Sequence, residues 1–367
     1  MKFNLSEDQI EFAEVAGHAF AKHSGLEYAR AALEHDIPFP KSEAWASLGA
    51  MELLADESRG GGGTVLDLTV VAEQAGKHLT PARLVSFAGR AVTLLEMLGS
   101  PEALALLDAG LTGERNVVVA DCTRHPAEQF RLDQAGAVHG RTAPVLDGVA
   151  ATDVILLAET EAGPVVVAVD LTGSSTAVRR IGPKPLDATR GLEVFELSGA
   201  PARILSAEAP VQPAWDRAKN IAVVLLAAED LGAATQANQL ARAYALTRHT
   251  FNRPIGSFQA VKHALVDAYV GEEQLRSLVW LAAWSADAQP ENLGLYAAAA
   301  GAYAADVLNR SAQTLIHTHG GVGFTWEHDA HLYWRRAQVD KELLGTAGSH
   351  RRTVAALNLD LDLEPVP

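Results

Sequence analysis

Residues 248–259 read RHTFNRPIGSFQ, and residues 317–329 read HTHGGVGFTWEHD. Each stretch follows a long segment in which apolar residues recur at helical spacing, residues 214–246 before the first and residues 293–317 before the second. Two more segments with helical spacing lie at residues 262–288 and 330–357. Long helices joined by short connections are typical of helix bundles. The two stretches are therefore predicted to lie at helix ends in a C-terminal four-helix bundle.

The rest of the chain has two other patterns. Residues 1–112 have helical spacing, and Ser6 and Gln9 have the spacing of a capping box at the first helix. Residues 113–208 contain short β-branched runs separated by Gly, Pro and Asp, as in a small β-domain. We predict an α+β multi-domain protein with three parts: an N-terminal helical domain (1–112), a middle β-domain (113–208) and the C-terminal four-helix bundle (209–367).

Composition restricts the class of protein. The 367 residues are 48% hydrophobic and 20% charged, as in folded domains. A formal net charge of −15 argues against nucleic-acid binding, which needs clustered Lys and Arg. The single cysteine, Cys122, excludes a disulfide within one chain and favours a cytoplasmic location. The N-terminus has no apolar signal core, and the longest apolar run, 221–228, is too short to span a membrane.

The first stretch carries groups that can bind phosphate. The Arg248 guanidinium can form two parallel hydrogen bonds to a pyrophosphate, and the Thr250 hydroxyl can add another. Phe251 can pack against an aromatic ring. An alternative role for Arg248 is to interact with the dipole at the helix C-terminus.

The second stretch carries glycines. Gly320 and Gly321 allow a backbone to approach a ligand closely, although a glycine-rich helix terminator is the alternative. His317 and His319 lie two residues apart, which does not match the i, i+4 spacing of a helical metal site. We therefore expect no metal here.

Together the motifs RxTFxRPIGSFQ and HGGVGFTWEHD, followed by Arg335-Arg336-Ala337, resemble those of acyl-CoA dehydrogenases of the actinobacterial lipid- and sterol-degrading type. The resemblance is specific over residues 240–350 and is architectural elsewhere. It implies FAD as the cofactor, an acyl-CoA substrate and an electron-transferring flavoprotein as the electron acceptor. It also implies tetramers, in which the Arg of the first motif reaches the FAD pyrophosphate of a neighbouring subunit.

The resemblance also assigns cofactor-binding residues. The matching positions are Arg248, Thr250, Phe251, His317, Gly320 and Gly321. His317 stands where the family often has Gln, and His can still donate a hydrogen bond.

The middle domain departs from the family pattern at its flavin-facing motifs. The family's TEPxxGSD loop corresponds to residues 119–126, which form a shorter stretch without the GSD. Its GxKxWIT motif corresponds to residues 140–146, with Pro144 where the flavin-covering Trp is expected. Both of this chain's own flavin-facing elements are therefore expected to be incomplete.

The catalytic base is missing from both of its family positions. The family reaction needs a carboxylate to remove the substrate's α-proton. One family position corresponds to Leu344 and the other lies near Ala222. Glu229 lies two turns beyond Ala222 on the same helix face, in an apolar stretch, and is the candidate catalytic residue. The alternative is a structural carboxylate inside the bundle, and Asp230 and Glu342 are weaker candidates for the base.

These losses suggest a division of labour. The half-site that a subunit gives to its neighbour's flavin is kept, whereas the half-site for its own flavin is degraded. The leading hypothesis is a subunit of an α2β2 acyl-CoA dehydrogenase that acts on bulky CoA thioesters, with steroid-derived acyl groups as one candidate class. The homologous partner would supply the missing loop, the Trp and the base. The alternatives are a self-sufficient homotetramer with Glu229 as base, and a non-catalytic structural subunit that binds no flavin.

Overall fold

The computed structural model describes residues 4–35, 47–122, 129–173, 176–182, 186–206 and 211–359. The chain divides into two compact units, which are described separately below. The helical unit contains Met1–Pro38, Val65–Thr80 and Val223–Asp362, and the second unit contains Phe39–Thr64, Pro81–Ala222 and Leu363–Pro367. This division groups segments by compactness and not by chain order, so the three domain boundaries at 1–112, 113–208 and 209–367 stay a prediction.

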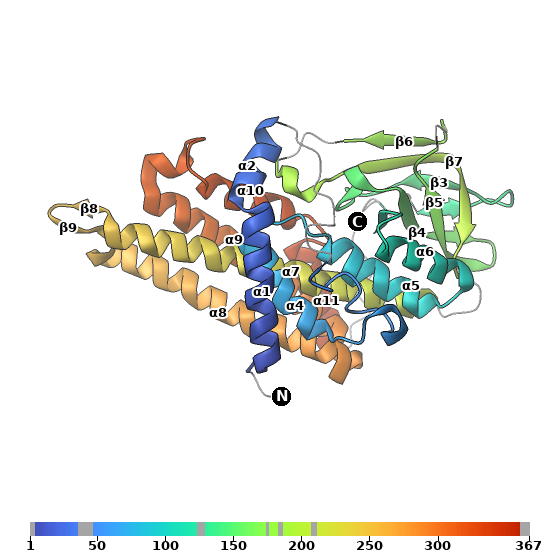
Figure 1. Cartoon of the computed structure of the whole chain (residues 1–367), viewed down its shortest axis with the longest axis horizontal. Coiled ribbons are helices and arrows are strands. Elements are labelled where there is room, and N and C mark those ends of the chain that lie inside the picture. Colours follow the sequence, from blue (N-terminus) through green and yellow to red (C-terminus); the bar gives the residue numbers. More distant parts are fainter. Residues whose placement is uncertain are drawn as a thin grey trace. The chain divides into compact units, whose positions relative to one another are not determined.

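The N-terminal part of the helical unit consists of α1 (Glu7–Ser24), α2 (Leu26–His35) and α4 (Val65–Lys77) (Figure 1). The predicted capping box at α1 is confirmed, because the Ser6 hydroxyl accepts from the Gln9 backbone while the Gln9 side chain accepts from the Ser6 backbone. The Ser24 hydroxyl at the end of α1 donates to the Thr80 hydroxyl at 2.8 Å. This buried hydrogen bond ties the end of α1 to the segment that follows α4.

The C-terminal part of this unit is built from the long helices α7 (Val211–Thr247), of which the residues from Val223 onward belong to this unit, α8 (Gln259–Ala288) and α9 (Leu293–His319). They confirm three of the predicted helices. The fourth predicted helix, 330–357, is two helices in the structure, α10 (Ala330–Asp340) and α11 (Ala347–Leu359). The break has a local cause, because Leu344 and Gly345 adopt φ values of 52° and 121°, which a right-handed helix does not contain.

Two glycines allow α4 and α7 to cross in direct backbone contact. A Cβ at Gly76 of α4 would lie 1.9 Å from the carbonyl oxygen of Glu229, and a Cβ at Gly232 of α7 would lie 1.8 Å from that of Glu73. Real Cβ atoms do not come so close, so neither position accepts a side chain. The helix crossing is thus set by backbone atoms on both sides.

The second unit contains the helices η1 (Glu57–Arg59), η2 (Leu84–Ala91), α5 (Val92–Leu98) and α6 (Pro101–Leu111). The segment η2 is a π-helix, which the sequence did not predict. The strands are β1 (Val117–Val119), β2 (Phe130–Leu132), β3 (Ala137–Arg141), β4 (Asp153–Thr160), β5 (Gly163–Asp170), β6 (Val178–Ile181) and β7 (Val194–Ile204).

The strands confirm the predicted β-domain and form a closed sheet. One edge of β4 pairs in parallel with β1 and then β2, while its other edge pairs antiparallel with β5. Antiparallel pairs β2–β3, β3–β7 and β5–β7 close the ring. Its interior is filled by Phe130, Phe195 and a set of buried Val, Leu and Ala side chains. The predicted order of helices, β-domain and helical bundle is therefore the fold that is observed.

Candidate functional site

The first motif forms the end of α7 and a short hairpin, β8 (His249–Thr250) and β9 (Arg253–Pro254), at the free ends of α7 and α8 (Figure 1). Its two central residues, Phe251 and Asn252, have φ values of 48° and 60°. Positive φ at both central residues is the geometry of a type I′ turn, in which Asn is common and Phe is strained. The Phe251 side chain is 88% exposed. The hairpin thus holds an aromatic ring in solvent at a cost in backbone strain.

The two arginines of this motif differ in their surroundings. The Arg253 guanidinium lies over the Phe258 ring, 3.9 Å from its centroid, and therefore packs within the hairpin. Arg248 is exposed, and its guanidinium forms no ion pair with a residue in the described ranges. Its backbone is held by hydrogen bonds from Arg248 N to Tyr244 O at 2.9 Å and from Ile255 N to Arg248 O at 2.8 Å. The backbone of Arg248 is thus held in place, while its guanidinium is accessible to a ligand.

The second motif ends α9 and forms η7 (Gly320–Phe324). Gly320 has φ 64° and ψ −141°, a conformation that glycine alone adopts readily. A Cβ at Gly320 or at Gly321 would meet no atom of the described residues within 4 Å. A Cβ at Gly323 would lie 2.9 Å from the Cβ of His319. Gly323 is therefore required by packing, whereas Gly321 has neither a packing nor a φ requirement within the chain.

A ring contact brings the two motifs together. The Tyr244 ring, one helical turn before Arg248, stacks on the His319 ring with centroids 4.0 Å apart. His319 directly precedes Gly320. Arg248, Thr250, Phe251, His317, Gly320 and Gly321 are all exposed, so the predicted cofactor-binding residues present an open surface. Sequence reasoning missed Tyr244 and His319 as parts of this site, although their places next to Arg248 and Gly320 were a usable signal.

Glu229 lies away from this surface. It precedes Arg248 by nineteen residues in α7, which corresponds to about 28 Å along the helix axis. Its side chain is 2% exposed, and its Oε2 lies 4.0 Å from Nη1 of Arg336, which is 1% exposed. Arg336 Nε also lies 3.9 Å from Asp340 Oδ2. This buried ion pairing favours the structural alternative for Glu229.

The two family positions for a base are closed as well as non-acidic. Ala222 is fully buried. Leu344 lines a void of only about 10 Å³, roughly the space of one water molecule. The His350 imidazole packs against two glycines of this lining. Its Nε2 would lie 2.9 Å from a Cβ at Gly345 and 3.0 Å from a Cβ at Gly301. The weaker candidates also differ in place, with Asp230 buried in this lining and Glu342 exposed.

Comparison with known proteins identifies the family of the chain. Residues 220–358 match the family model for the acyl-CoA dehydrogenase C-terminal domain. Acyl-CoA dehydrogenase IpdE2 of Mycobacterium tuberculosis is 33% identical over 349 residues, which cover 92% of this chain and 93% of that protein. The chain belongs to the acyl-CoA dehydrogenase family.

Two solved structures extend the similarity to the whole fold. The ChsE4-ChsE5 complex from Mycobacterium tuberculosis contains a chain that matches with a TM-score of 0.89 and 26% identity, over 99% of this chain and 100% of that chain. A variant of the Tcur3481-Tcur3483 steroid ACAD matches with a TM-score of 0.84 and 25% identity, over 96% and 98%. Both comparisons confirm the predicted fold class.

Pro144 stands where the resemblance leads us to expect the flavin-covering Trp, and it is exposed. The neighbouring Thr142 is buried, and its hydroxyl accepts from Phe195 N at 2.9 Å. The segment around Pro144 is therefore fixed to the sheet, and at Pro144 itself it presents no large aromatic side chain.

The loop that corresponds to the family's TEPxxGSD motif is only partly visible, since residues 123–126 lie outside the described part of the chain. At its start, Asp121 pairs with Arg90 at 2.7 Å and with Lys219 at 3.8 Å. Burial opposes ionisation of Asp121, but the two cations outweigh it and lower its pKa to about 2. Asp121 is thus held as a paired carboxylate.

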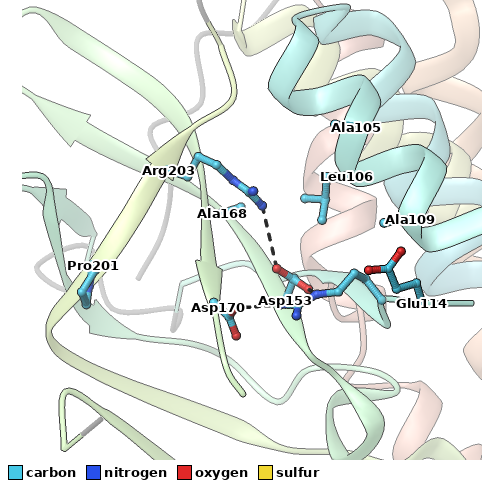
Figure 2. A pocket seen from close by; sticks show the side chains of 10 residues that line it. Ala105, Leu106, Ala109, Glu114, Asp153, Ala168, Asp170, Pro201 and Arg203 are labelled. Atoms are coloured by element: carbon cyan, nitrogen blue, oxygen red, sulfur yellow. Dashed lines mark hydrogen bonds and ion pairs between the residues drawn. The ribbon is translucent and has the colours of Figure 1, made fainter. Parts of the chain in front are cut away.

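A cavity of about 440 Å³ lies in the second unit, between α6 and the ends of β4, β5 and β7 (Figure 2). Its charged groups neutralise one another. Arg115 pairs with Asp153 at 2.5 Å and with Asp170 at 3.0 Å, while Arg203 reaches to 4.0 Å from Asp153. This cavity shares no residue with the two motifs and is not the candidate cofactor site.

The described residues contain no group of three or more His, Cys, Asp or Glu side chains placed to share a metal ion. None of their helices combines the length and apolar character that spanning a membrane requires.

Proposed function

We propose that this chain is a subunit of a FAD-dependent acyl-CoA dehydrogenase that gives a flavin-binding half-site to a homologous partner, in an α2β2 heterotetramer. The observation that carries the proposal is the contrast between an open half-site around Arg248 and closed, non-acidic base positions at Ala222 and Leu344. A subunit that served only itself would need the second region as well as the first.

The residues at the bundle end fit a dinucleotide. The exposed Arg248 guanidinium is a bidentate donor for a pyrophosphate, and the Thr250 and His317 side chains are further donors at the same surface. Gly320 and Gly321 leave the space where a Cβ would stand, so a ligand backbone or phosphate can approach. Phe251 offers its ring to an aromatic group. When bound, FAD supplies the acceptor for the hydride that leaves the acyl β-carbon.

In this proposal the role of the chain is to bind and orient the cofactor. Arg248 neutralises pyrophosphate charge from outside the partner's own binding surface, while the Gly320-Gly321 backbone limits where the nucleotide lies. The proton at the acyl α-carbon is removed by a carboxylate of the partner. The position of the Glu229 carboxylate beside the Arg336 guanidinium inside the bundle supports a structural role for Glu229 over a role as that base.

The surface around the half-site supports a protein partner. Phe251, Val322, Phe324 and Trp326 belong to the two motifs and are each more than half exposed. Exposed large apolar side chains are typical of surfaces that contact another protein. The ChsE4-ChsE5 relative is named as a complex, and another relative is named as a steroid ACAD. We therefore propose a homologous subunit as the partner, a CoA thioester with a bulky, steroid-derived acyl group as the substrate, and an electron-transferring flavoprotein as the electron acceptor.

The first test is the flavin content of the chain, measured by visible absorption beside the protein concentration. Purified alone, the chain is expected to be colourless. Co-purified with its homologous partner, it should carry about one flavin per pair of chains. One flavin per chain in the isolated protein would instead support the homotetramer, and a complex without flavin would support the structural subunit.

The second test is Arg248→Ala in the co-purified complex. Loss of two charge-assisted hydrogen bonds should weaken flavin binding about 100-fold while the subunits still assemble. Arg242→Ala, which removes another exposed arginine of α7, is the matched control and should bind flavin normally. Full flavin occupancy in Arg248→Ala would refute the half-site. If Glu229→Gln abolished turnover with normal flavin content, the base would lie in this chain.

A further inference from the structure

The two proposed cofactor-binding motifs come from helix ends far apart in the sequence, yet a ring contact joins the helices that carry them. Tyr244 lies in α7 one turn before Arg248, and His319 is the last residue of α9 before Gly320. Their rings stack at 4.0 Å with an interplanar angle of 27°. Tyr244 lies behind Arg248 and His319 lies behind Gly320, so one ring contact connects the supports of both motifs.

The His319 side chain is also held by neighbours other than Tyr244. Its side chain is 8% exposed, and Nδ1 donates to Leu315 O at 2.9 Å, because a carbonyl oxygen can only accept. Its other neighbour is the His328 ring, at 4.3 Å. Gly323 folds against the His319 Cβ so closely that a methyl group would not fit. The imidazole orientation is thus fixed by α9, by η7 and by the segment before α10.

His328 connects this stack to the start of α10. Its Nδ1 accepts from Ala330 N at 3.1 Å, which requires that nitrogen to be unprotonated. Asp329 beside it pairs with Arg30 of α2 at 2.5 Å. The Arg30 guanidinium also donates to the Trp326 carbonyl oxygen. The third ring of the stack is therefore anchored to a helix from the other end of the chain.

We infer that Tyr244, His319 and His328 form a positioning stack that sets the distance between Arg248 and the Gly320-Gly321 backbone, and hence the affinity of the half-site for the nucleotide. The inference rests on the proposed function, since it assigns these residues to the same cofactor. They are positioning residues and not catalytic ones, because Tyr244 and His319 act through Arg248 and Gly320.

Flavin affinity should depend on the flat rings of Tyr244 and His319 and not only on the volume of these side chains. In Tyr244→Leu or His319→Leu a branched aliphatic chain replaces one flat ring, so the helix ends are free to shift although the site still excludes water. Flavin affinity of the co-purified complex should fall about tenfold, the equivalent of about 1.4 kcal/mol. Tyr244→Phe and His319→Phe keep a stacking ring and should bind flavin within about twofold of the unmodified complex.

The experiment measures the flavin dissociation constant by fluorescence titration of the deflavinated complex, together with the thermal midpoint of each variant. Normal flavin affinity in the Phe variants would show that a ring at these positions is sufficient. A general loss of folding would instead appear as a lower thermal midpoint. Unchanged affinity in both Leu variants would overturn the inference. Arg248→Ala, measured in the same series, distinguishes the two proposals. Full flavin binding in Arg248→Ala would refute the half-site itself. Full flavin binding in the Leu variants alone would refute only the positioning role of the stack.

Discussion

Two regions of the helical unit differ in how far they are open to solvent. At the end of α7 and α9, Arg248, Phe251 and Gly321 are exposed and no neighbour in the described chain fills the space in front of the glycines. Around Glu229 and Leu344, side chains are packed shut and charges are paired. The first region is therefore open to a ligand or a partner, whereas the second is filled by the chain itself. In the proposed function, the first region is the surface that this chain would give to a neighbouring subunit's flavin.

The largest expected effect tests the closed region. Arg336→Met leaves Glu229 and Asp340 buried beside a neutral side chain, which should cost about 3–5 kcal/mol of unfolding free energy. Denaturant titration of the chain measures this loss. Arg351→Met is the matched control, because Arg351 pairs with Asp306 on the surface and should cost less than about 1 kcal/mol. Equal losses in the two variants would show that the region around Glu229 is not closed.

Next in size is a pair of glycine substitutions that separates the open surface from its support. Gly323→Ala places a methyl group 2.9 Å from the His319 Cβ and should destabilise the fold by about 1–3 kcal/mol. Gly321→Ala meets no atom within 4 Å and should change stability by less than about 0.5 kcal/mol. Flavin affinity of the complex should nevertheless fall about tenfold in Gly321→Ala. Normal flavin binding in that variant would remove Gly321 from the half-site.

A smaller effect concerns the strained turn. Phe251→Asn places a residue that tolerates positive φ in the type I′ turn, and should stabilise the chain by about 0.5–1 kcal/mol. The same change should weaken flavin binding, because the exposed ring is lost. Thermal unfolding and flavin titration measure the two effects. Phe324→Asn removes another exposed ring without positive φ and should leave stability unchanged. A destabilised Phe251→Asn would mean that the turn is not strained.

The smallest effect is a dependence of stability on pH. Burial, and then the neighbouring His319, lowers the pKa of His328, while burial, and then Arg335, lowers that of His331. A histidine whose folded pKa lies below the unfolded value of 6.5 binds fewer protons when folded, so its contribution is complete above pH 6.5 and is lost as pH falls through the folded pKa. The thermal midpoint should therefore fall on acidification.

The matched variants for this effect are His328→Phe, which should reduce the acid-induced loss by about 1 °C, and His18→Gln on the surface of α1, which should not change it. The thermal midpoint at pH 7.5 and at pH 5.5 measures both. An identical pH dependence in all three proteins would contradict the assignment of His328.

The sequence predicted most of the fold because its signals are local. The capping box of Ser6 and Gln9 and the apolar spacing of α7, α8 and α9 act within a few residues of one another. The break at Leu344 was missed because a leucine gives no sign of a left-handed conformation. The π-helix at Leu84–Ala91 was missed because its apolar pattern resembles that of an α-helix.

For the candidate site too, local motifs could be recognised in the sequence, whereas contacts between distant residues could not. Arg248 and the glycines could be proposed as cofactor-binding residues because each lies in a contiguous motif. The pairing of Glu229 with Arg336 and the stacking of Tyr244 on His319 join residues that only the folded chain brings together. A base candidate chosen from its apolar neighbours in sequence therefore could not be distinguished from a structural carboxylate.

The backbone contact between α4 and α7 bears on how related subunits could be recombined. Because Gly76 and Gly232 admit no side chain, a shift of either helix by one residue would bring a Cβ into the other helix's carbonyl groups. A chimera that takes its N-terminal helices from a homologous chain must therefore carry glycine at the position of Gly76 and meet glycine at the position of Gly232. Crossover points for such an exchange can be chosen by aligning these two positions.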